Sequence, residues 1–220
     1  MSPSFLRELE RQERWRALPS RERAGRPNTA VLSFDDGPDP EGTPAVLDAL
    51  EAEGVRATFF VLGEQLLANP RLGRTLTERG HEVALHGHRH EPHDDLRPQA
   101  VRDDIARGLG TAEVACGRRP RFYRPPYGFF TGPSHAACAD LGLEPVLWSA
   151  WGLDWEEVPA SRIAELVVRD LAEGAIVLLH DSARYAPRAD VRPTAEAIPA
   201  IAAAAREAGL ELLPLGEALG

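Results

Sequence analysis

The sequence predicts a parallel α/β fold whose strands converge on one rim, as in a (β/α) barrel. Seven apolar, strand-like segments alternate with segments of helical periodicity, which is typical of a parallel sheet with helical crossovers. A closed barrel brings the C-terminal ends of its strands together, whereas an open sheet spreads them along a line. Side chains with catalytic or metal-binding chemistry follow most of these strand ends, at Asp35, Asp36, His86, Arg124, Asp154 and His180. This placement favours the barrel.

The elements follow one another in a regular order. The first strand is expected at residues 29–34 and ends before the turn-forming pair Gly37-Pro38. Thr43 is a candidate N-cap for the next helix, Pro44 suits its first position and Gly54 suits its end. Further strands are expected at residues 57–62, 81–85, 122–123, 145–149, 175–179 and 210–215. A helix is expected to follow the strand at residues 57–62 and to run to about residue 79. Further helices are expected at residues 98–115, 134–141, 162–171 and 194–208.

Composition limits the possible partners. The formal net charge of −9 argues against a nucleic-acid backbone as a partner. No apolar run is long enough to span a bilayer, so no membrane partner is expected. All 25 Lys and Arg positions are Arg, which excludes chemistry that needs a lysine. Nothing in the sequence indicates the oligomeric state.

The chain is expected to form one domain with an appendage. Residues 1–28 are predicted to be a charged, helical N-terminal appendage with an apolar stripe at Phe5, Leu6 and Leu9, and residues 29–220 the catalytic domain. No secretory signal is present, so as encoded the protein is expected in the cytoplasm, and outside it only if the sequence had been trimmed. Cys116 and Cys138 are expected to be two reduced, buried thiols, although a single bridge between them is an alternative.

Asp35 and Asp36 place two carboxylates side by side at the end of a buried strand. Adjacent like charges raise each other's pKa unless a cation offsets them. A metal ion on one carboxylate would supply that cation and leave the other carboxylate free for proton transfer. The alternative is an ordinary Asp-Gly turn with two solvated acids. The motifs further along the chain favour the metal.

His86 and His90 follow the third strand with a spacing of four residues, which puts two imidazoles on the same side of one helical turn. Two histidines and a carboxylate form a common ligand set for a divalent metal with open positions. His86 and His88 would share a face instead if the strand continued. The pair His86 and His90 is favoured because Gly87 is expected to break the strand.

Three further stretches carry candidate chemistry. In the rigid loop RPPYG, Arg124 is suited to pair with a carboxylate, and the backbone N–H of Tyr127 to face a developing oxyanion; a structural turn is the alternative. His180 directly follows the strand expected at residues 175–179. Its place at the end where other polar groups gather favours a role as a general acid or base. An aromatic cluster around Asp154 suits a carbohydrate platform, a small apolar pocket or ordinary core packing, and consists of Trp148, Trp151 and Trp155.

Taken together, these motifs make the chain resemble the polysaccharide deacetylases of the NodB-homology type, carbohydrate esterase family 4. Five motifs occur in the family's order: FDDGP at residues 34–38, RGHEVALHGHRH at 79–90, RPPYG at 124–128, LDW at 153–155 and IVLLHD at 176–181. The resemblance covers about residues 30–215. It implies a distorted (β/α) barrel with about seven strands, in agreement with the strand count above.

The resemblance also implies a role for each site residue. Asp35 would be the general base, oriented and kept ionised by Arg124. The metal ligands would be Asp36, His86 and His90, and the metal would be zinc, with cobalt or nickel as alternatives. Tyr127 would supply an oxyanion N–H, and His180 would be the general acid, tuned by Asp154. Trp155 and Leu178 would wall the pocket for the acetyl methyl group, and Trp151 is an additional candidate for substrate contact.

Two positions depart from the family pattern. Gly87 stands where the family usually has Ser or Thr, which predicts a loop with less support from its own side chain. Trp151 stands where the fourth motif usually opens with Asp, which predicts a changed pocket wall. Neither change removes a predicted ligand or proton-transfer group.

The implied activity is metal-dependent removal of acetyl groups from an acetylated carbohydrate, as N-deacetylation or O-deacetylation. Three alternatives are open from the sequence. The first is an inactive relative that only binds carbohydrate, and the second is a hydrolase of a small acetylated amine. The third is a non-haem iron oxygenase that uses the two histidines and one carboxylate.

Overall fold

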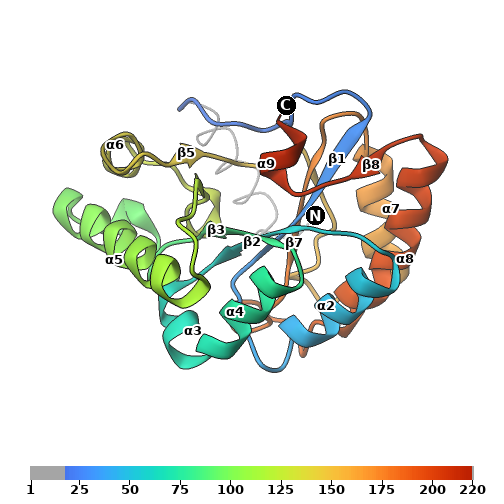
Figure 1. The fold of residues 1–220 in the computed structure, drawn as a ribbon, viewed down its shortest axis with the longest axis horizontal. Helices are drawn as coiled ribbons and strands as arrows, with labels where there is room; N and C mark the ends of the chain where they lie inside the picture. Colours follow the sequence, from blue (N-terminus) through green and yellow to red (C-terminus); the bar gives the residue numbers. More distant parts are fainter. Residues whose placement is uncertain (1–17, 220) are drawn as a thin grey trace.

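The computed structural model describes residues 18–219, and its helices surround a curled parallel sheet (Figure 1). The central strand β1 (Thr29–Asp35) is hydrogen-bonded to β2 (Thr58–Val61) on one side and to β7 (Ile176–His180) on the other. The strand order is β5-β4-β3-β2-β1-β7-β6, and β8 pairs with the start of β1. The remaining strands are β3 (Glu82–Leu85), β4 (Phe122–Tyr123), β5 (Glu144–Pro145), β6 (Ala150–Trp151) and β8 (Glu211–Leu212). The predicted distorted (β/α) barrel is thereby confirmed.

The strand predicted at residues 145–149 is wrong in one respect, because the structure divides it into β5 and β6. The N–H of Val146 donates to the carbonyl of Tyr123 in β4, whereas the N–H of Ser149 donates to the carbonyl of Ile176 in β7. The backbone therefore changes its hydrogen-bonding partner within four residues, and no continuous ladder can form. This short segment crosses from one side of the curled sheet to the other.

The described part of the predicted appendage, residues 18–28, is extended and lies against the body. Arg21 forms an isolated bridge with Val146, and Arg23 forms one with Ala175. Arg21 also makes an ion pair with Glu144. Residues 21–23 therefore connect the chain after β5 with the residue that precedes β7. The predicted apolar stripe at Phe5, Leu6 and Leu9 lies outside the described residues.

The helices are mostly where the sequence predicts them. They are α2 (Thr43–Ala52), α3 (Gly63–Ala68), α4 (Pro70–Glu78), α5 (Pro98–Cys116), α6 (Gly132–Leu141), α7 (Ala160–Asp170), α8 (Arg192–Glu207) and α9 (Leu215–Ala218), with short 3₁₀ turns η1 (His93–Asp95) and η2 (Pro126–Gly128). The helix predicted to run to residue 79 is instead two helices, because Pro70 offers no backbone N–H and restricts the residue before it.

Thr43 is not the N-cap of α2, which corrects a prediction. Gly42 holds that position. The Thr43 hydroxyl instead donates to Oδ2 of Asp181 at 2.5 Å and accepts from the N–H of Asp39 at 2.7 Å. Thr43 therefore joins the loop after β1 to the end of β7, directly below the candidate site.

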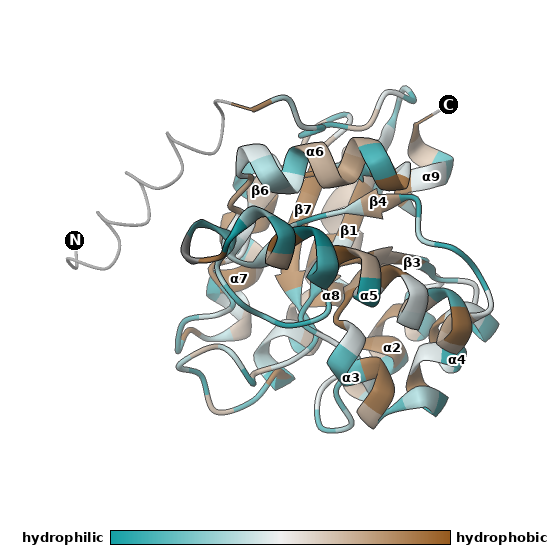
Figure 2. Ribbon diagram, turned by 90° about the vertical axis from the view of Figure 1, so that its left-hand side faces the viewer, coloured by the Kyte–Doolittle hydropathy of each residue, from teal (hydrophilic) through white to brown (hydrophobic). Residues whose placement is uncertain are grey.

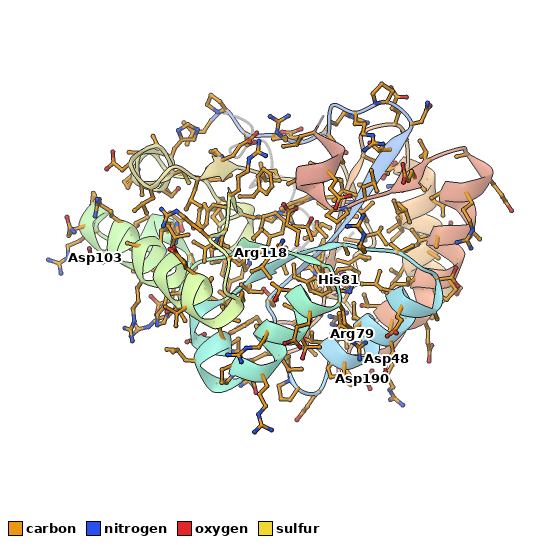
Figure 3. All side chains as sticks on the ribbon, in the orientation of Figure 1. Asp48, Arg79, His81, Asp103, Arg118 and Asp190 are labelled. Carbon is orange, nitrogen blue, oxygen red and sulfur yellow. The ribbon has the colours of Figure 1, made fainter. Side chains whose placement is uncertain are left out.

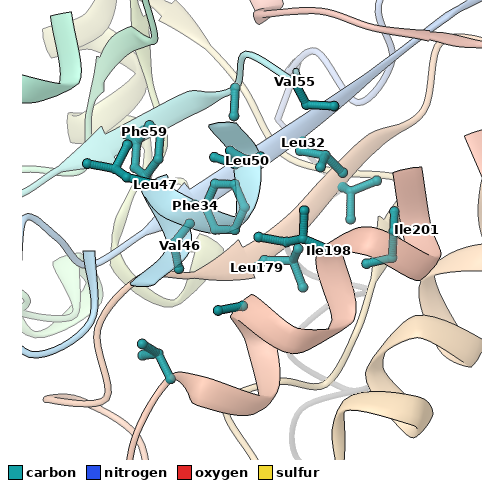
Figure 4. Close-up of a cluster of buried hydrophobic side chains, with 14 of the residues drawn as sticks. Leu32, Phe34, Val46, Leu47, Leu50, Val55, Phe59, Leu179, Ile198 and Ile201 are labelled. Atoms are coloured by element: carbon teal, nitrogen blue, oxygen red, sulfur yellow. The ribbon is translucent and has the colours of Figure 1, made fainter. Parts of the chain in front are cut away.

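The largest apolar cluster lies between the sheet and the helices α2 and α8 (Figure 4). Phe34 stacks on Phe59 with ring centroids 5.1 Å apart. Leu32 joins Phe34 on this face of β1, whereas Val31 belongs to the cluster inside the curl of the sheet. Each fully buried side chain of this kind stabilises the fold by about 1.5–3 kcal/mol. Figure 2 shows the same division, with hydrophobic strands inside and hydrophilic segments on the surrounding helices.

Ion pairs on the outer surface connect neighbouring helices. Figure 3 labels Arg79 and Asp48, whose Nη1 and Oδ1 atoms are 3.0 Å apart and connect the end of α4 with α2. Cys116 and Cys138 are free and buried, as predicted. Burial raises the pKa of the Cys116 thiol to about 11. None of the helices in residues 18–219 has the length and apolarity needed to cross a membrane.

Candidate active site

The C-terminal ends of the strands open into one cavity of about 250 Å³. β1 delivers Asp35 and the residue after it, and β7 ends at His180. The other walls come from the segments after β3, β4, β5, β6 and β7. The predicted site residues that line this cavity are Asp35, Asp36, His86, His90, Tyr127, Trp155, Leu178 and His180. Arg124 and Asp154 lie just beneath it and contact the lining side chains.

Asp36 leaves the strand geometry of β1 in a strained conformation. Its φ of 81° lies in the left-handed region, which costs a residue other than glycine about 1–3 kcal/mol. The turn brings Oδ1 of Asp36 to 3.4 Å from Nε2 of His86 and to 3.2 Å from Nε2 of His90. Three potential ligand atoms therefore meet at one point, as the sequence predicts for the pair with four-residue spacing, but residues 86–90 form an irregular loop and not the predicted helical turn.

These three atoms fit a divalent metal. Nδ1 of His86 lies 2.8 Å from the carbonyl oxygen of Arg124, which can only accept, so Nδ1 is the donor of this contact and Nε2 is the ring nitrogen left to face Asp36 and a metal ion. Oδ1 of Asp36 is buried and has no hydrogen-bond partner. Ligand atoms about 2.0–2.1 Å from a tetrahedral zinc ion lie about 3.3 Å from one another, close to the distances above. The set Asp36, His86 and His90 is therefore a candidate metal site.

The electrostatics agree with an ionised ligand. Burial raises the pKa of the Asp36 carboxyl, but the charge of His90 and the nearby ring nitrogens of His86 and His90 outweigh it, so the pKa lies well below its usual value. Asp36 is therefore a carboxylate at neutral pH, which is the form that binds a cation.

Asp35 pairs with a buried arginine. Nη1 of Arg124 donates to Oδ1 of Asp35 at 2.6 Å and to Oγ of Ser33 at 3.0 Å. The guanidinium also lies over the ring of Phe60, 4.0 Å from its centroid. Burial lowers the pKa of Arg124, and the charge of Asp35 opposes that change. The predicted contact between Arg124 and Asp35 is therefore present, but through one oxygen of the carboxylate.

His180 pairs with Asp154 on the other side of β1. Nδ1 of His180 lies 2.8 Å from Oδ1 of Asp154, and the N–H of His180 donates to Oδ2 at 2.9 Å. Burial lowers the pKa of His180, but the charge and hydrogen bond of Asp154 outweigh it, so the pKa is raised. Because Nδ1 faces the carboxylate, the other nitrogen is the one available to the cavity.

Arg188 is a site residue that the sequence analysis missed. Its Nη1 donates to the carbonyl of Asp154 at 2.5 Å and to Oδ2 of Asp154 at 3.2 Å, and its Nη2 donates to the carbonyl of His180 at 3.1 Å. The hydroxyl of Thr194 adds a further hydrogen bond to Asp154 at 2.8 Å. Burial raises the pKa of Asp154, but His180 and Arg188 outweigh it and lower the pKa. Arg188 follows no strand end, so no pattern in the sequence marked it.

The aromatic residues divide between the cavity and its support. Trp155 lies edge-on to His180, with ring centroids 5.7 Å apart, and lines the cavity as predicted. The prediction for Trp151 is corrected, because Trp151 packs between Trp155 and Trp148 and is not among the lining residues. Trp148 lines the cavity in its place. Tyr127 has a φ of 59°, a second strained residue at this rim.

The loop that carries the two histidines is supported from outside. Gly87 has a φ of 107°, a backbone conformation that residues with a side chain rarely adopt. The carboxylate of Asp104 in α5 accepts from the N–H of His88 at 2.9 Å and from the N–H of Arg89 at 3.1 Å. Residue 87 is a glycine and has no hydroxyl to support the loop. The hydrogen bonds to Asp104 support it instead. The sequence analysis missed it because Asp104 is one of several charged residues on an amphipathic helix.

We expect Asp181 to make stability pH-dependent. Burial raises the pKa of the Asp181 carboxyl from 3.8 to about 7, and its Oδ1 has no hydrogen-bond partner. Between about pH 4 and pH 7 the folded state therefore holds a proton that the unfolded state releases, and stability falls as pH rises, by at most about 1.4 kcal/mol per pH unit. Urea unfolding of the metal-free protein across this range measures the slope.

Asp181→Asn should flatten that slope and stabilise the protein at pH 7–8 relative to the parent, because an amide stays neutral and still accepts from Thr43. Asp190→Asn, on the surface of the same loop, is the matched control. Parallel stability profiles for the parent and Asp181→Asn would contradict the assignment.

The curled α/β barrel brings a candidate Asp-His-His metal site together with an Asp–Arg pair and a His–Asp pair, which are groups that a hydrolase can use. The comparison with known families is more specific. The chain belongs to the polysaccharide deacetylase family, whose sequence model matches residues 22–146. This span includes the first three motifs, and the fourth and fifth motifs lie beyond it.

Two relatives with similar sequences are a chitooligosaccharide deacetylase and a peptidoglycan-N-acetylglucosamine deacetylase. A chitooligosaccharide deacetylase of Bradyrhizobium sp. (strain ANU 289) is 40% identical over 154 residues, which are 70% of this chain and 70% of the relative. A peptidoglycan-N-acetylglucosamine deacetylase of Listeria monocytogenes is 36% identical over 69% of this chain, but over only 32% of its own length.

Solved structures share the fold over a larger part of the chain. A family 4 carbohydrate esterase from Streptomyces lividans, in complex with acetate, has a TM-score of 0.75 and 32% identity over 83% of this chain and 90% of that one. A pseudoenzyme of the same family from Bacillus anthracis has a TM-score of 0.81 and 24% identity over 91% of this chain and 68% of that one. The second likeness concerns the fold alone.

Proposed function

We propose that the chain is a metal-dependent deacetylase that hydrolyses the N-acetyl group of an acetylated amino sugar. The observation that carries the proposal is the shared cavity. It brings a candidate metal site, a carboxylate paired with Arg124 and a histidine paired with Asp154 within reach of one small substrate group. Hydrolysis of an amide needs these three functions: activation of water, removal of its proton and protonation of the leaving amine.

Asp36, His86 and His90 would hold the metal ion. When bound, a divalent ion lowers the pKa of a water molecule from about 16 toward 7 and polarises a carbonyl oxygen. Zinc fits the ligand set of two imidazoles and one carboxylate, and cobalt or nickel would suit the same ligands. The metal ion is thus part of the proposal, with zinc as its first candidate.

The chain's own groups would carry the proton transfers. Asp35 accepts a proton from the attacking water, and Arg124 orients the carboxylate. The N–H of Tyr127, between Pro126 and Gly128, donates to the acetyl oxygen as negative charge develops on it. His180 then donates the proton on its Nε2 to the leaving nitrogen, while Asp154 holds Nδ1. Acetate and a free amine are the products.

The substrate proposal rests on the relatives and on the cavity walls. Trp155 and Leu178 would contact the acetyl methyl group, and Trp148 adds a flat apolar surface. Chitooligosaccharides and peptidoglycan fragments both present N-acetylglucosamine, and we take this sugar as the first substrate class. Acetylated xylan and small acetylated amines test the two alternatives of O-deacetylation and non-glycan hydrolysis.

The test is acetate release from N-acetylglucosamine oligomers by zinc-loaded protein, with acetylxylan and acetylated small amines assayed in parallel. We expect turnover on the N-acetylated oligomers and its loss with a chelator. Binding of the oligomers without turnover would assign the chain to the inactive, carbohydrate-binding relatives instead. Oxygen-dependent turnover without acetate release would revive the oxygenase alternative.

Asp154→Asn should move the pH profile of turnover. His180 acts as an acid in its protonated form, so activity is lost as pH rises through its pKa. Removing the charge of Asp154 removes the main cause that raises this pKa, and the basic limb should shift to lower pH. We also expect kcat to fall by a factor of about 10² or more, because the imidazole loses its orienting carboxylate.

The measurement is the pH dependence of kcat for Asp154→Asn beside Glu157→Gln, which removes an exposed carboxylate three residues away. Glu157→Gln should reproduce the profile of the parent. An unchanged basic limb in Asp154→Asn would show that the limb reports a group other than His180.

A further inference from the structure

The two candidate histidine ligands are held in different ways. Nδ1 of His86 has a hydrogen-bond partner, the carbonyl oxygen of Arg124 at 2.8 Å. Nδ1 of His90 is buried and has no hydrogen-bond partner among the described residues. Metal-binding histidines almost always donate their second ring nitrogen to a carboxylate, a carbonyl or water, which fixes the orientation of the ring. The orientation of the His90 ring must therefore be fixed by a contact other than a hydrogen bond to Nδ1.

The ring of Tyr185 provides a flat surface against His90. The two rings are stacked, with centroids 4.3 Å apart and an angle of 15° between their planes. Tyr185 lies in the loop between β7 and α8, 95 residues away in sequence from His90. The ring of Tyr127 is tilted against the same imidazole, with ring centroids 4.5 Å apart. The imidazole is therefore in contact with two aromatic side chains.

Tyr185 is itself fixed at its far end. Its hydroxyl donates to Oε1 of Glu64 at 2.7 Å and accepts from Nε2 of Gln65 at 3.0 Å. Both partners lie at the start of α3, and the N–H of Glu64 donates to the carbonyl of His88 in the histidine loop. The helix that fixes Tyr185 is therefore bonded to the loop that carries His90. Ring, helix and loop form one connected unit.

We propose that Tyr185 is a positioning residue that orients the His90 imidazole toward the metal by stacking, in place of a hydrogen bond to Nδ1. With the ring held flat against Tyr185, Nε2 of His90 points at Oδ1 of Asp36 at 3.2 Å. Tyr185 also lines the cavity, so its loss can act on the metal or on the substrate. The inference rests on the metal site of the proposed function and names the group that holds one of its ligands.

The test is zinc affinity measured without substrate, by competition with a chromophoric chelator. We expect Tyr185→Leu, which keeps apolar bulk but no flat ring, to raise the zinc Kd about 10–100-fold, the usual cost of losing a group that orients a ligand. Tyr185→Phe keeps the ring and should rescue most of the affinity. Arg184→Ala, an exposed neighbour in the same loop, is the matched control. Visible spectra of the cobalt-loaded variants report the coordination directly.

The outcomes separate the two proposals. If the parent protein binds zinc and Tyr185→Leu binds it equally well with a higher KM, Tyr185 is only a cavity wall and the inference is wrong. If the parent binds no zinc, the proposed function itself fails. Should Tyr185→Leu not fold, Tyr185→Met fills the same space with an unbranched apolar side chain and no ring, and an unchanged Kd there would also overturn the inference.

Discussion

Asp35→Asn is expected to lower kcat for deacetylation by a factor of about 10²–10⁴, the usual contribution of a general base. The amide cannot accept the proton of the attacking water at neutral pH. Its oxygen still accepts the hydrogen bond that Nη1 of Arg124 makes at 2.6 Å, so the buried arginine keeps a partner. The measurement is kcat on an N-acetylglucosamine oligomer at saturating zinc, with zinc content determined for each variant.

Ser33→Ala is the matched control for Asp35→Asn. Ser33 accepts from the same nitrogen of Arg124 at 3.0 Å, but its side chain does not line the cavity. We expect Ser33→Ala to bind zinc normally and to lose less than about tenfold in kcat, since it removes the hydroxyl's hydrogen bonds with Arg124 and Val177 but leaves the Asp35 carboxylate and its bond to Arg124 in place. Full activity in zinc-loaded Asp35→Asn would assign the base to another group and would reopen the division of roles between Asp35 and Asp36.

His90→Ala is expected to abolish high-affinity zinc binding and, with it, turnover. It removes one of three ligands from a site whose remaining atoms, on Asp36 and His86, are 3.4 Å apart. The loss should exceed the 10–100-fold that a group outside the ligand set contributes. Zinc content after dialysis and kcat with added zinc are the two measurements.

His88→Ala distinguishes the two ligand pairs that the sequence allows. His88 is buried beside Gly63, and its pKa is lowered by burial, but it does not belong to the three residues whose ligand atoms meet. We expect His88→Ala to retain its zinc even if its stability falls. If His88→Ala lost zinc and His90→Ala retained it, the ligand pair would be His86 and His88 instead.

The sequence predicts the parts of this site that come from strand ends. Asp35 and His180 are register partners on neighbouring strands, so the alternation of strands and helices was enough to bring them to one rim. The spacing of His86 and His90 identified the pair that faces Asp36, because β3 ends at Leu85 and Gly87 turns the chain with a φ of 107°. Local chain geometry determines all of these positions, and local patterns therefore indicate them.

Groups that act across long sequence distances escaped prediction. Asp104, Arg188 and Tyr185 each support a predicted site residue, but from a helix surface or an irregular loop. Their contacts depend on how elements pack, and packing leaves no periodic signal. The same limit explains Trp151, since which of three nearby tryptophans faces the cavity depends on the change of partner between β5 and β6.

A zinc titration of acetate release tests the central claim most directly. Metal-free protein is mixed with increasing zinc, and acetate release from an N-acetylglucosamine oligomer is measured at each step. We predict no release without metal and a linear rise that reaches a plateau at about one zinc per chain, as a single three-ligand site requires. Release that is independent of zinc, or no release at any zinc content, would contradict the account.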